Sequence, residues 1–359
     1  MTDGRFYPEM ATSGNRGDVG VTVGLNAIVV AVTGDVPRIL TVRRPLEIAD
    51  HPLDSNEAET APEHSGDGAL GGREGVPFGP LDPVADRTLE LGLRRWLAEQ
   101  TGIEVGYLEQ LYTFGDRGRV APVGNRFLSV AYLALTREVE VSGSGAPIWA
   151  PWYSYLPWED WRDGPPAILG KHIFPALQDW IASASTDRSW AQRHERAQIA
   201  FGLGGTPWNR NRVLDRYELL FEIGLVAEAV PGTDSASTHG VEIGRPMALD
   251  HRRIVATALE RLRGKLSYRP VAFELLPGTF TLLRLQQVVE ALSGERLHKQ
   301  NFRRLVEQNR LVERTGDIEV RTGGRPAELF RFRREVLRER PAIGVVIQRG
   351  RLATETHNG

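Results

Sequence analysis

The residues best suited to recognition chemistry form the run HKQNFRRL at 298–305. Arginine can bind guanine through two hydrogen bonds, asparagine can do the same for adenine, and lysine pairs with phosphate. Phe302, Leu305 and Val306 recur at helical spacing, which predicts a helix over roughly 298–309 with these three residues in its core face. The opposite face would carry the nucleic-acid contacts, and the candidates are His298, Lys299, Asn301, Arg303 and Arg304.

The elements around this run have the order of a winged helix. Residues 279–310 contain two short amphipathic helical patterns, and a strand, a Gly/Arg/Pro loop and a second strand follow, ending at GGRPAELFRFR (323–333). Arg325 follows two glycines that let the backbone approach a phosphate, which makes it a sixth candidate. Residues 295–340 hold 13 Lys and Arg against 8 Asp and Glu, so positive charge gathers in this domain.

Length and composition narrow the class of protein. A chain of 359 residues is long enough for two or three domains, and its charged fraction of 25% is ordinary for globular proteins. The net charge of −2 argues against a protein that coats nucleic acid. The absence of cysteine excludes disulfides and thiolate metal sites. Because no apolar run is long enough to span a bilayer and no signal pattern opens the chain, we expect a cytoplasmic protein without a membrane partner.

The pattern of apolar residues in the first half of the chain predicts an α/β sandwich. Residues 21–32 form a continuous apolar, β-branched run, and 38–42 would be its hairpin partner after the turn at Gly34. Residues 86–100 have helical spacing, and two strand-like segments follow at 105–114 and 127–135. We expect an arm at 1–17, a sandwich domain over 18–158 and a surface loop within it at 45–75, because the loop's Gly, Pro and acidic residues cannot bury much surface.

The middle of the chain predicts a helical insertion at 159–245, with helical patterns around 174–184, 188–201 and 211–230. A further amphipathic helix at 249–267 would link it to the winged helix, so that 246–340 forms the C-terminal domain before a tail at 341–359. Residues 146–168 hold four of the eight tryptophans, which could be core anchors or could stack on an adenine ring. These are Trp149, Trp152, Trp158 and Trp161.

Residues 77–103 resemble a degenerate Nudix box, the motif G-x5-E-x7-R-E-U-x-E-E-x-G-U in which U is apolar. Arg95, Leu97, Glu99, Gly102 and Ile103 match it. Three expected acidic positions hold Trp96, Gln100 and Arg87 instead. Nudix hydrolysis needs clustered carboxylates to hold Mg²⁺ on a diphosphate. We therefore expect no hydrolase activity, no catalytic residues and no metal site.

The chain is also similar to the Nudix-related transcriptional regulators of NAD metabolism, the NrtR-like proteins, and the insertion resembles their alphaproteobacterial NadQ branch. The segments 107–119, 127–135 and 249–333 carry this resemblance. It implies an α+β multidomain fold: a Nudix-like α/β/α sandwich, a helical insertion and a C-terminal winged helix. It also implies a homodimer that binds double-stranded operator DNA and represses NAD biosynthesis or salvage genes.

In this family an adenine nucleotide binds the sandwich, so the resemblance implies ADP-ribose, NAD or ATP as effector, with no cofactor required. By position, the effector site would draw on Arg43 and Arg44 at the end of the second strand. Arginines suit a diphosphate because they bind it with two hydrogen bonds, and Phe114 could stack on the adenine. The other side would be lined by Glu99, Phe114, Asp116 and Arg119.

Two other readings stay open. The chain could be a Nudix hydrolase of ADP-ribose or a dinucleotide with an accessory DNA-binding domain, since Glu99 survives among the acidic positions. It could also be an adaptor whose insertion recruits another protein. Each candidate residue also has a plainer role, as a solvated helix face or a surface turn.

Overall fold

The computed structural model describes residues 21–43, 74–116, 126–229, 243–266, 270–319 and 326–336. Arg44, Arg119 and Arg325 lie outside these ranges, as do the arm, most of the 45–75 loop and the tail. No helix among the described residues combines the length and the apolar character that crossing a membrane requires.

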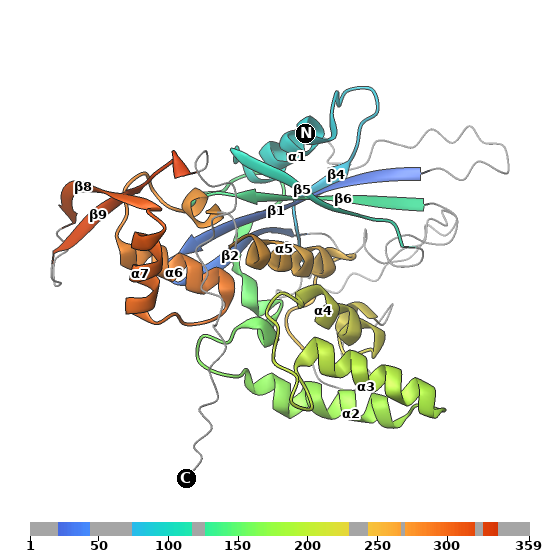
Figure 1. Cartoon of the computed structure of the whole chain (residues 1–359). Helices are drawn as coiled ribbons and strands as arrows, with labels where there is room; N and C mark the ends of the chain where they lie inside the picture. The colour runs from blue at the N-terminus through green and yellow to red at the C-terminus, as the bar shows by residue number, and fades with distance from the viewer. Residues whose placement is uncertain are drawn as a thin grey trace, which may run out of the picture.

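The N-terminal half is built on a mixed seven-stranded sheet (Figure 1). Strands β1 (Val21–Thr33) and β2 (Val36–Arg43) form the predicted hairpin. The main path runs β3 (Glu74–Gly75), β2, β1, β6 (Arg126–Leu135), β5 (Tyr107–Phe114), while β4 (Phe78–Pro80) pairs with β1 and β7 (Ile148–Pro151) with β2. Only the β1–β6 pairing is parallel among these strands.

Alternation along β1 divides the sheet into two faces. Leu25, Ala27 and Val29 lie in one core with helix α1 (Leu89–Thr101), which begins at the N-cap Thr88 and ends at Gly102 with φ 69°. Ile28 and Val30 lie in the larger core on the other face, together with helix α5 (His251–Leu266). The predicted α/β/α sandwich is therefore present.

Helix α5 differs from its predicted role as a linker. Its residues Ile254, Val255, Ala258 and Leu259 are buried in the core shared with the sheet. It is the second helical layer of the sandwich, although the insertion separates it in sequence from the strands. The same core also contains Leu285 and Phe302 of the C-terminal domain, so α5 packs between the sheet and that domain.

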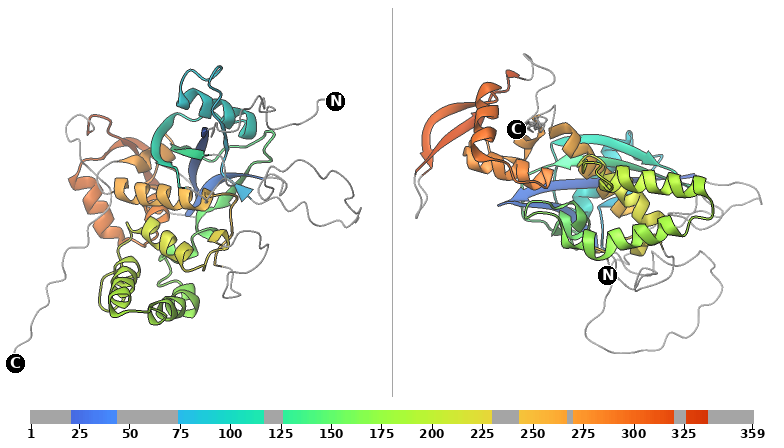
Figure 2. Two further views of the ribbon diagram at one scale, coloured as in Figure 1. Left: turned by 90° about the vertical axis from the view of Figure 1, so that its right-hand side faces the viewer. Right: turned by 60° about the horizontal axis from the view of Figure 1, so that its bottom comes forward.

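The insertion contains the three predicted helices, α2 (Phe174–Ala182), α3 (Asp187–Phe201) and α4 (Val213–Glu222). A π-helical turn (Leu169–Ile173) precedes them and a 3₁₀ turn (Ala227–Ala229) follows. Helix α4 packs against α5, and α3 and α2 lie further out (Figure 2). Trp152 and Trp158, in or beside the 3₁₀ turns Trp152–Ser154 and Pro157–Glu159, are fully buried, as expected of core anchors.

The C-terminal domain has the predicted order. A 3₁₀ turn (Val271–Leu275) leads to α6 (Leu282–Ser293) and α7 (Lys299–Gln308), and the hairpin β8 (Val312–Glu319) and β9 (Ala327–Phe332) follows. Phe280 and Phe330 exchange two backbone hydrogen bonds of 2.9 and 2.8 Å, which fixes the hairpin to the start of α6. The fold is an α+β multidomain structure with a winged helix at its C-terminal end.

Candidate nucleic-acid interface and nucleotide site

Helix α7 is held by two buried side chains and exposes the rest of its surface. Phe302 and Val306 are fully buried, and Leu305 is half-buried beside them. The helix starts directly after His298. This amphipathic arrangement follows from the i, i+4 spacing of the apolar residues, which leaves the polar positions no core to enter.

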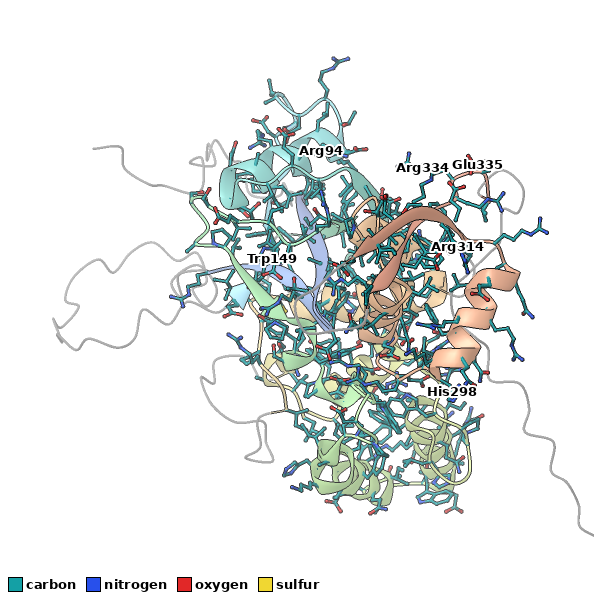
Figure 3. The ribbon with its side chains drawn as sticks, turned by 90° about the vertical axis from the view of Figure 1, so that its left-hand side faces the viewer. Arg94, Trp149, His298, Arg314, Arg334 and Glu335 are labelled. Carbon is teal, nitrogen blue, oxygen red and sulfur yellow. The ribbon has the colours of Figure 1, made fainter. Side chains whose placement is uncertain are left out.

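The five predicted reading residues at 298–304 are all exposed. His298, at the N-cap position, is exposed at the surface (Figure 3). The cations of the exposed face of α7 are Lys299, Arg303 and Arg304. Within the described ranges, no carboxylate lies within ion-pair distance of them. Cations that the protein leaves unpaired are free to meet phosphate oxygens or base edges. The exposed residues are His298, Lys299, Asn301, Arg303 and Arg304.

The arginines of the β8–β9 hairpin are less available for nucleic-acid contacts than the cations of α7. Arg314 lies 3.3 Å from Glu328, and Arg331 lies 2.5 Å from Glu313, each pair joining β8 to β9. These surface pairs partly neutralise the described part of the wing. The predicted contact at Arg325 lies outside the described residues.

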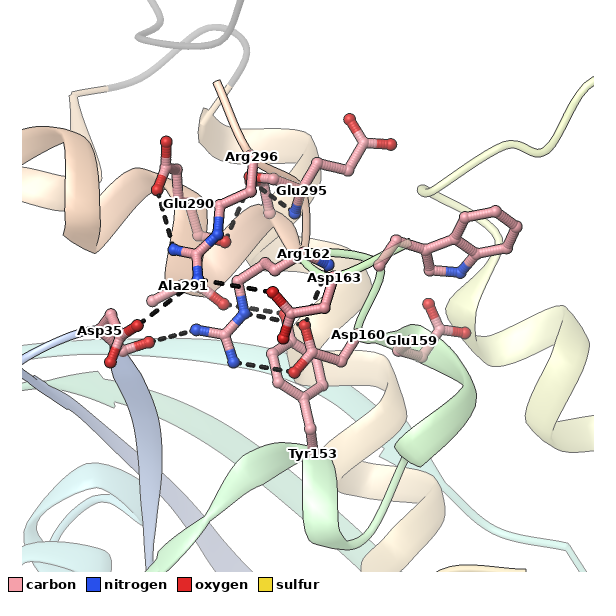
Figure 4. Close-up of polar contacts among 12 residues, drawn as sticks. Asp35, Tyr153, Glu159, Asp160, Arg162, Asp163, Glu290, Ala291, Glu295 and Arg296 are labelled. Carbon is pink, nitrogen blue, oxygen red and sulfur yellow. Dashed lines mark hydrogen bonds and ion pairs between the residues drawn. The ribbon is translucent and has the colours of Figure 1, made fainter. Parts of the chain in front are cut away.

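Helix α6 is fastened to the sandwich through the β1–β2 turn. Arg284 donates to the carbonyl of Val32 at 2.6 Å and also to that of Gly34. Arg296, after α6, lies 3.7 Å from Asp35, 3.8 Å from Asp163 and 3.2 Å from Glu290 (Figure 4). The contacts that reach Val32, Gly34, Asp35 and Asp163 cannot be predicted from sequence, because each joins residues from distant segments.

The degenerate Nudix positions on α1 have structural partners. The indole of Trp96 donates to the carbonyl of Pro80 at 2.9 Å, and its ring covers Gly79, where a Cβ would lie 2.0 Å away. Gln100 receives the backbone N–H of Phe78 at 3.0 Å and donates to the carbonyl of the same residue at 2.7 Å. An amide can bond a donor and an acceptor at once, which a carboxylate cannot. Arg87 is exposed at the surface.

The residues near the degenerate box do not fit a magnesium site. Glu99 lies 3.6 Å from Arg95, and Arg95 also pairs with Asp86 at 3.0 Å. Its guanidinium stands 4.6 Å from the Trp96 ring. No cluster of three or more His, Asp or Glu side chains that could hold a metal occurs among the residues described. A positive group among the carboxylates disfavours a divalent cation.

Among the described effector candidates, Glu99 and Phe114 do not share a face of the sheet. Glu99 belongs to α1, whereas Phe114 is buried in the core on the opposite face of the sheet. The Phe114 ring is covered by the guanidinium of Arg253 at 4.8 Å, so it is not open for stacking on an adenine. Asp116 pairs with Arg253 at 2.6 Å. Arg43 is exposed at the end of β2.

The polar group around Arg253, near the start of α5, was not predicted from the sequence. Arg253 contacts Asp116, Glu218 and Asp250, from three separate segments. Burial alone would lower its pKa, but these carboxylates raise it above the ordinary value, so its positive charge is secure. Only the Asp250–Arg253 spacing is visible in the sequence, since Asp116 and Glu218 reach Arg253 only in the folded chain.

Comparison with known proteins identifies the C-terminal domain. Residues 272–332 match the family model of the NrtR DNA-binding winged helix domain. The chain is 37% identical over 86 residues to the "ADPR responsive transcriptional repressor NtrR" of Acinetobacter baylyi. That match covers 24% of this chain and 34% of the relative, so the chain spans about a third of the curated relative it matches.

Two solved structures overlap with most of the chain. The Shewanella oneidensis NrtR structure in complex with a 27mer DNA is 22% identical and covers 88% of this chain and 94% of its own, with a TM-score of 0.49. A MutT/nudix family protein from Enterococcus faecalis is 15% identical and covers 89% and 90%, with a TM-score of 0.48. The family comparison therefore assigns residues 272–332 to the type of the NrtR DNA-binding winged helix domain.

Proposed function

We propose that this protein is a transcriptional repressor of NAD biosynthesis or salvage genes that binds double-stranded operator DNA through α7 and the wing. The observation that carries the proposal is the exposed cationic face of α7, whose cations have no carboxylate partner in the described part of the chain, in a domain that matches a DNA-binding family model. Its reading residues would be His298, Lys299, Asn301, Arg303 and Arg304, together with Arg325.

The proposal includes a homodimer. A winged helix inserts one helix into the major groove, and two copies related by a two-fold axis read a palindromic operator. Each copy would supply one α7, so that the operator half-sites would lie about one helical turn apart. The name of the A. baylyi relative, a repressor that responds to ADP-ribose, supports the regulatory role.

The sandwich domain would bind the effector, which is ADP-ribose, NAD or ATP. The effector site remains a proposal built on Arg43, Arg44 and Glu99, with Asp116 and Arg119 as further candidates. Arg44 and Arg119 lie outside the described residues. A ligand changes DNA affinity only as far as it binds the two states of the protein differently. Hydrolysis is not part of the proposal, because Trp96 and Gln100 hold backbone groups where carboxylates would bind Mg²⁺.

The test is a binding measurement on DNA duplexes that the full chain selects from a random library. We expect selection of a palindromic sequence and a change in its affinity of about fivefold or more with one of ADP-ribose, NAD or ATP. Failure to select any sequence, with each nucleotide and without any, would contradict the DNA-binding function. Turnover of ADP-ribose with Mg²⁺ that is lost in Glu99→Gln would support the hydrolase alternative instead.

A further inference from the structure

The turn between α6 and α7 sits in a close-fitting site formed by distant parts of the chain. Gly294 ends α6 with φ 73°, and its carbonyl accepts a hydrogen bond from the backbone N–H of Trp161 at 2.8 Å. A Cβ on Gly294 would lie 2.5 Å from the carbonyl oxygen of Glu159 and 2.6 Å from Nη2 of Arg263. The turn that precedes α7 therefore has little freedom to move.

Two further contacts bind the last carbonyls of α6, and a third joins the two chain segments that supply them. The hydroxyl of Tyr153 donates to the carbonyl of Ala291 at 2.8 Å. Arg263 of α5 donates through Nε to the carbonyl of Leu292 at 3.4 Å. The same arginine donates through Nη2 to the carbonyl of Glu159 at 2.8 Å. We call Tyr153, Glu159, Trp161 and Arg263 the turn cradle.

The insertion holds this cradle from the other side. Arg216 of α4 is fully buried and donates to both carboxylate oxygens of Glu159, at 2.6 and 2.9 Å. Its third nitrogen donates to the carbonyls of Ala200 at 3.0 Å and Asn209 at 2.9 Å, and its guanidinium lies 3.9 Å from the centre of the Trp208 ring. One side chain thus joins α3, the α3–α4 loop and the cradle.

The α3–α4 loop reaches the turn directly as well. The carbonyl of Arg210 accepts a hydrogen bond from Arg263 at 3.0 Å, and its side chain lies 3.7 Å from Glu295, the residue after Gly294. Arg263 also pairs with Glu159, so the carboxylate keeps a cationic partner even without Arg216. The contribution of Arg216 is therefore geometric: its two parallel hydrogen bonds fix the orientation of Glu159.

We propose that the helical insertion is a positioning element for the DNA-binding turn, with Arg216 acting through Glu159 and Arg263 to set the orientation of α7. The inference rests on the proposed function, since DNA recognition makes the orientation of α7 matter. A reading helix must be held to within a fraction of an ångström for base-edge hydrogen bonds to form. Phosphate contacts tolerate more displacement because they carry no sequence information.

The experiment compares Arg216→Met with Arg196→Met in the full chain. Arg196 provides the matched control, because it pairs with Glu222 of the same insertion at 2.6 Å but is half-exposed. Binding is measured by fluorescence anisotropy to a duplex selected by the wild-type chain and to a scrambled duplex. For Arg216→Met we expect about tenfold weaker binding to the selected duplex and unchanged binding to the scrambled one. The control should stay within about twofold of wild type.

Amide hydrogen exchange at 294–298 gives a readout that does not depend on DNA. Faster exchange there in Arg216→Met alone supports the positioning role, even if the wild-type chain selects no duplex and the proposed function fails. Unchanged exchange and unchanged affinity for the selected duplex overturn it. Equal weakening on both duplexes, with the helical signal retained, overturns it too, since a displaced α7 should lose base-edge contacts before phosphate contacts.

If Arg216→Met does not fold, a comparison of Gly294→Ala with Gly205→Ala tests the positioning role instead. Both glycines have positive φ, 73° and 86°, but a Cβ on Gly205 would meet nothing within 4 Å. The strain of the added methyl is then similar, and only Gly294 has the cradle beside it. We expect Gly294→Ala alone to lose discrimination between the two duplexes and to exchange faster at the turn. Equal behaviour of the two variants would overturn the proposal.

Discussion

The arginines of the interior and the cations of α7 have opposite environments. Arg216, Arg252 and Arg263 are at most 1% exposed, and each pairs with a carboxylate and with backbone carbonyls. Lys299, Arg303 and Arg304 are exposed, with no carboxylate partner among the residues the structure describes. Similar residue types therefore serve two different purposes.

The difference follows from the cost of desolvation. A buried guanidinium is tolerated only where its charge and its donors are matched, and such a group fixes the surrounding segments in one arrangement. An exposed guanidinium keeps its hydration and adds little to stability, so it can exchange water for phosphate or a base edge. The interior group determines where α7 lies, and the surface group determines what α7 can bind.

The largest effect should come from breaking the interior group. Glu159→Gln leaves Arg216 and Arg263 buried without their carboxylate, so we expect a loss of about 3–5 kcal/mol in the free energy of unfolding. Chemical denaturation measures it. Glu222→Gln removes the exposed partner of Arg196 and should cost less than about 1 kcal/mol. Equal losses of unfolding free energy in the two variants would show that burial does not make the Glu159 ion pairs more important for stability than the exposed Glu222 pair.

The next effect concerns binding alone. Arg304→Ala should weaken operator binding by about 1–3 kcal/mol, concentrated at one operator position, because a base-edge contact is lost. The free energy of unfolding should change by less than about 0.5 kcal/mol. Arg188→Ala, at an exposed arginine of α3, is the control and should leave operator affinity unchanged. A loss of stability in Arg304→Ala would assign the residue to the fold instead.

A smaller effect is expected at Lys299. If its ammonium meets a phosphate, Lys299→Ala should weaken binding to all duplexes alike. The slope of log affinity against log salt should fall by about one unit. A titration of salt concentration on operator and scrambled duplexes checks this. A change confined to the operator would place Lys299 against a base.

The smallest expected effect is the pH dependence of stability that comes from Glu159. Burial alone would raise the pKa of Glu159, but Arg216 and Arg263 hold it below the ordinary value of 4.5. A depressed folded-state pKa gives stability that is present above the unfolded value and lost as pH falls through the folded value. The difference in unfolding free energy between wild type and Glu159→Gln should be flat above about pH 5 and shrink at lower pH. A difference that shrinks above pH 6 would contradict this assignment.

Local pattern was enough to predict most of the elements. The β1–β2 hairpin, α1 and α7 follow from apolar periodicity and from the turn and helix-stop residues Gly34 and Gly102. The exposure of Arg303 and Arg304 could be predicted too, since Phe302 and Val306 fix which side of α7 is buried. These are properties of neighbouring residues, which a sequence displays directly.

Long-range contacts could not be predicted in the same way. Phe114 was expected at a ligand site, yet it lies beneath Arg253, which is far from it in sequence. Glu159 and Arg216 are 57 positions apart, and Glu159 and Arg263 are 104 apart. No periodicity marks these partners, because only the folded chain brings them to bonding distance.

The sequence by itself determined which side chains α7 offers to a ligand, because helical spacing and side-chain chemistry are local. Only the tertiary structure decided where α7 is held, through the β1–β2 turn, α5 and the insertion. It also decided that Trp96 and Gln100 bind backbone groups of β4. The physical reason is the same in each case: burial makes a polar group depend on partners that may come from any part of the chain.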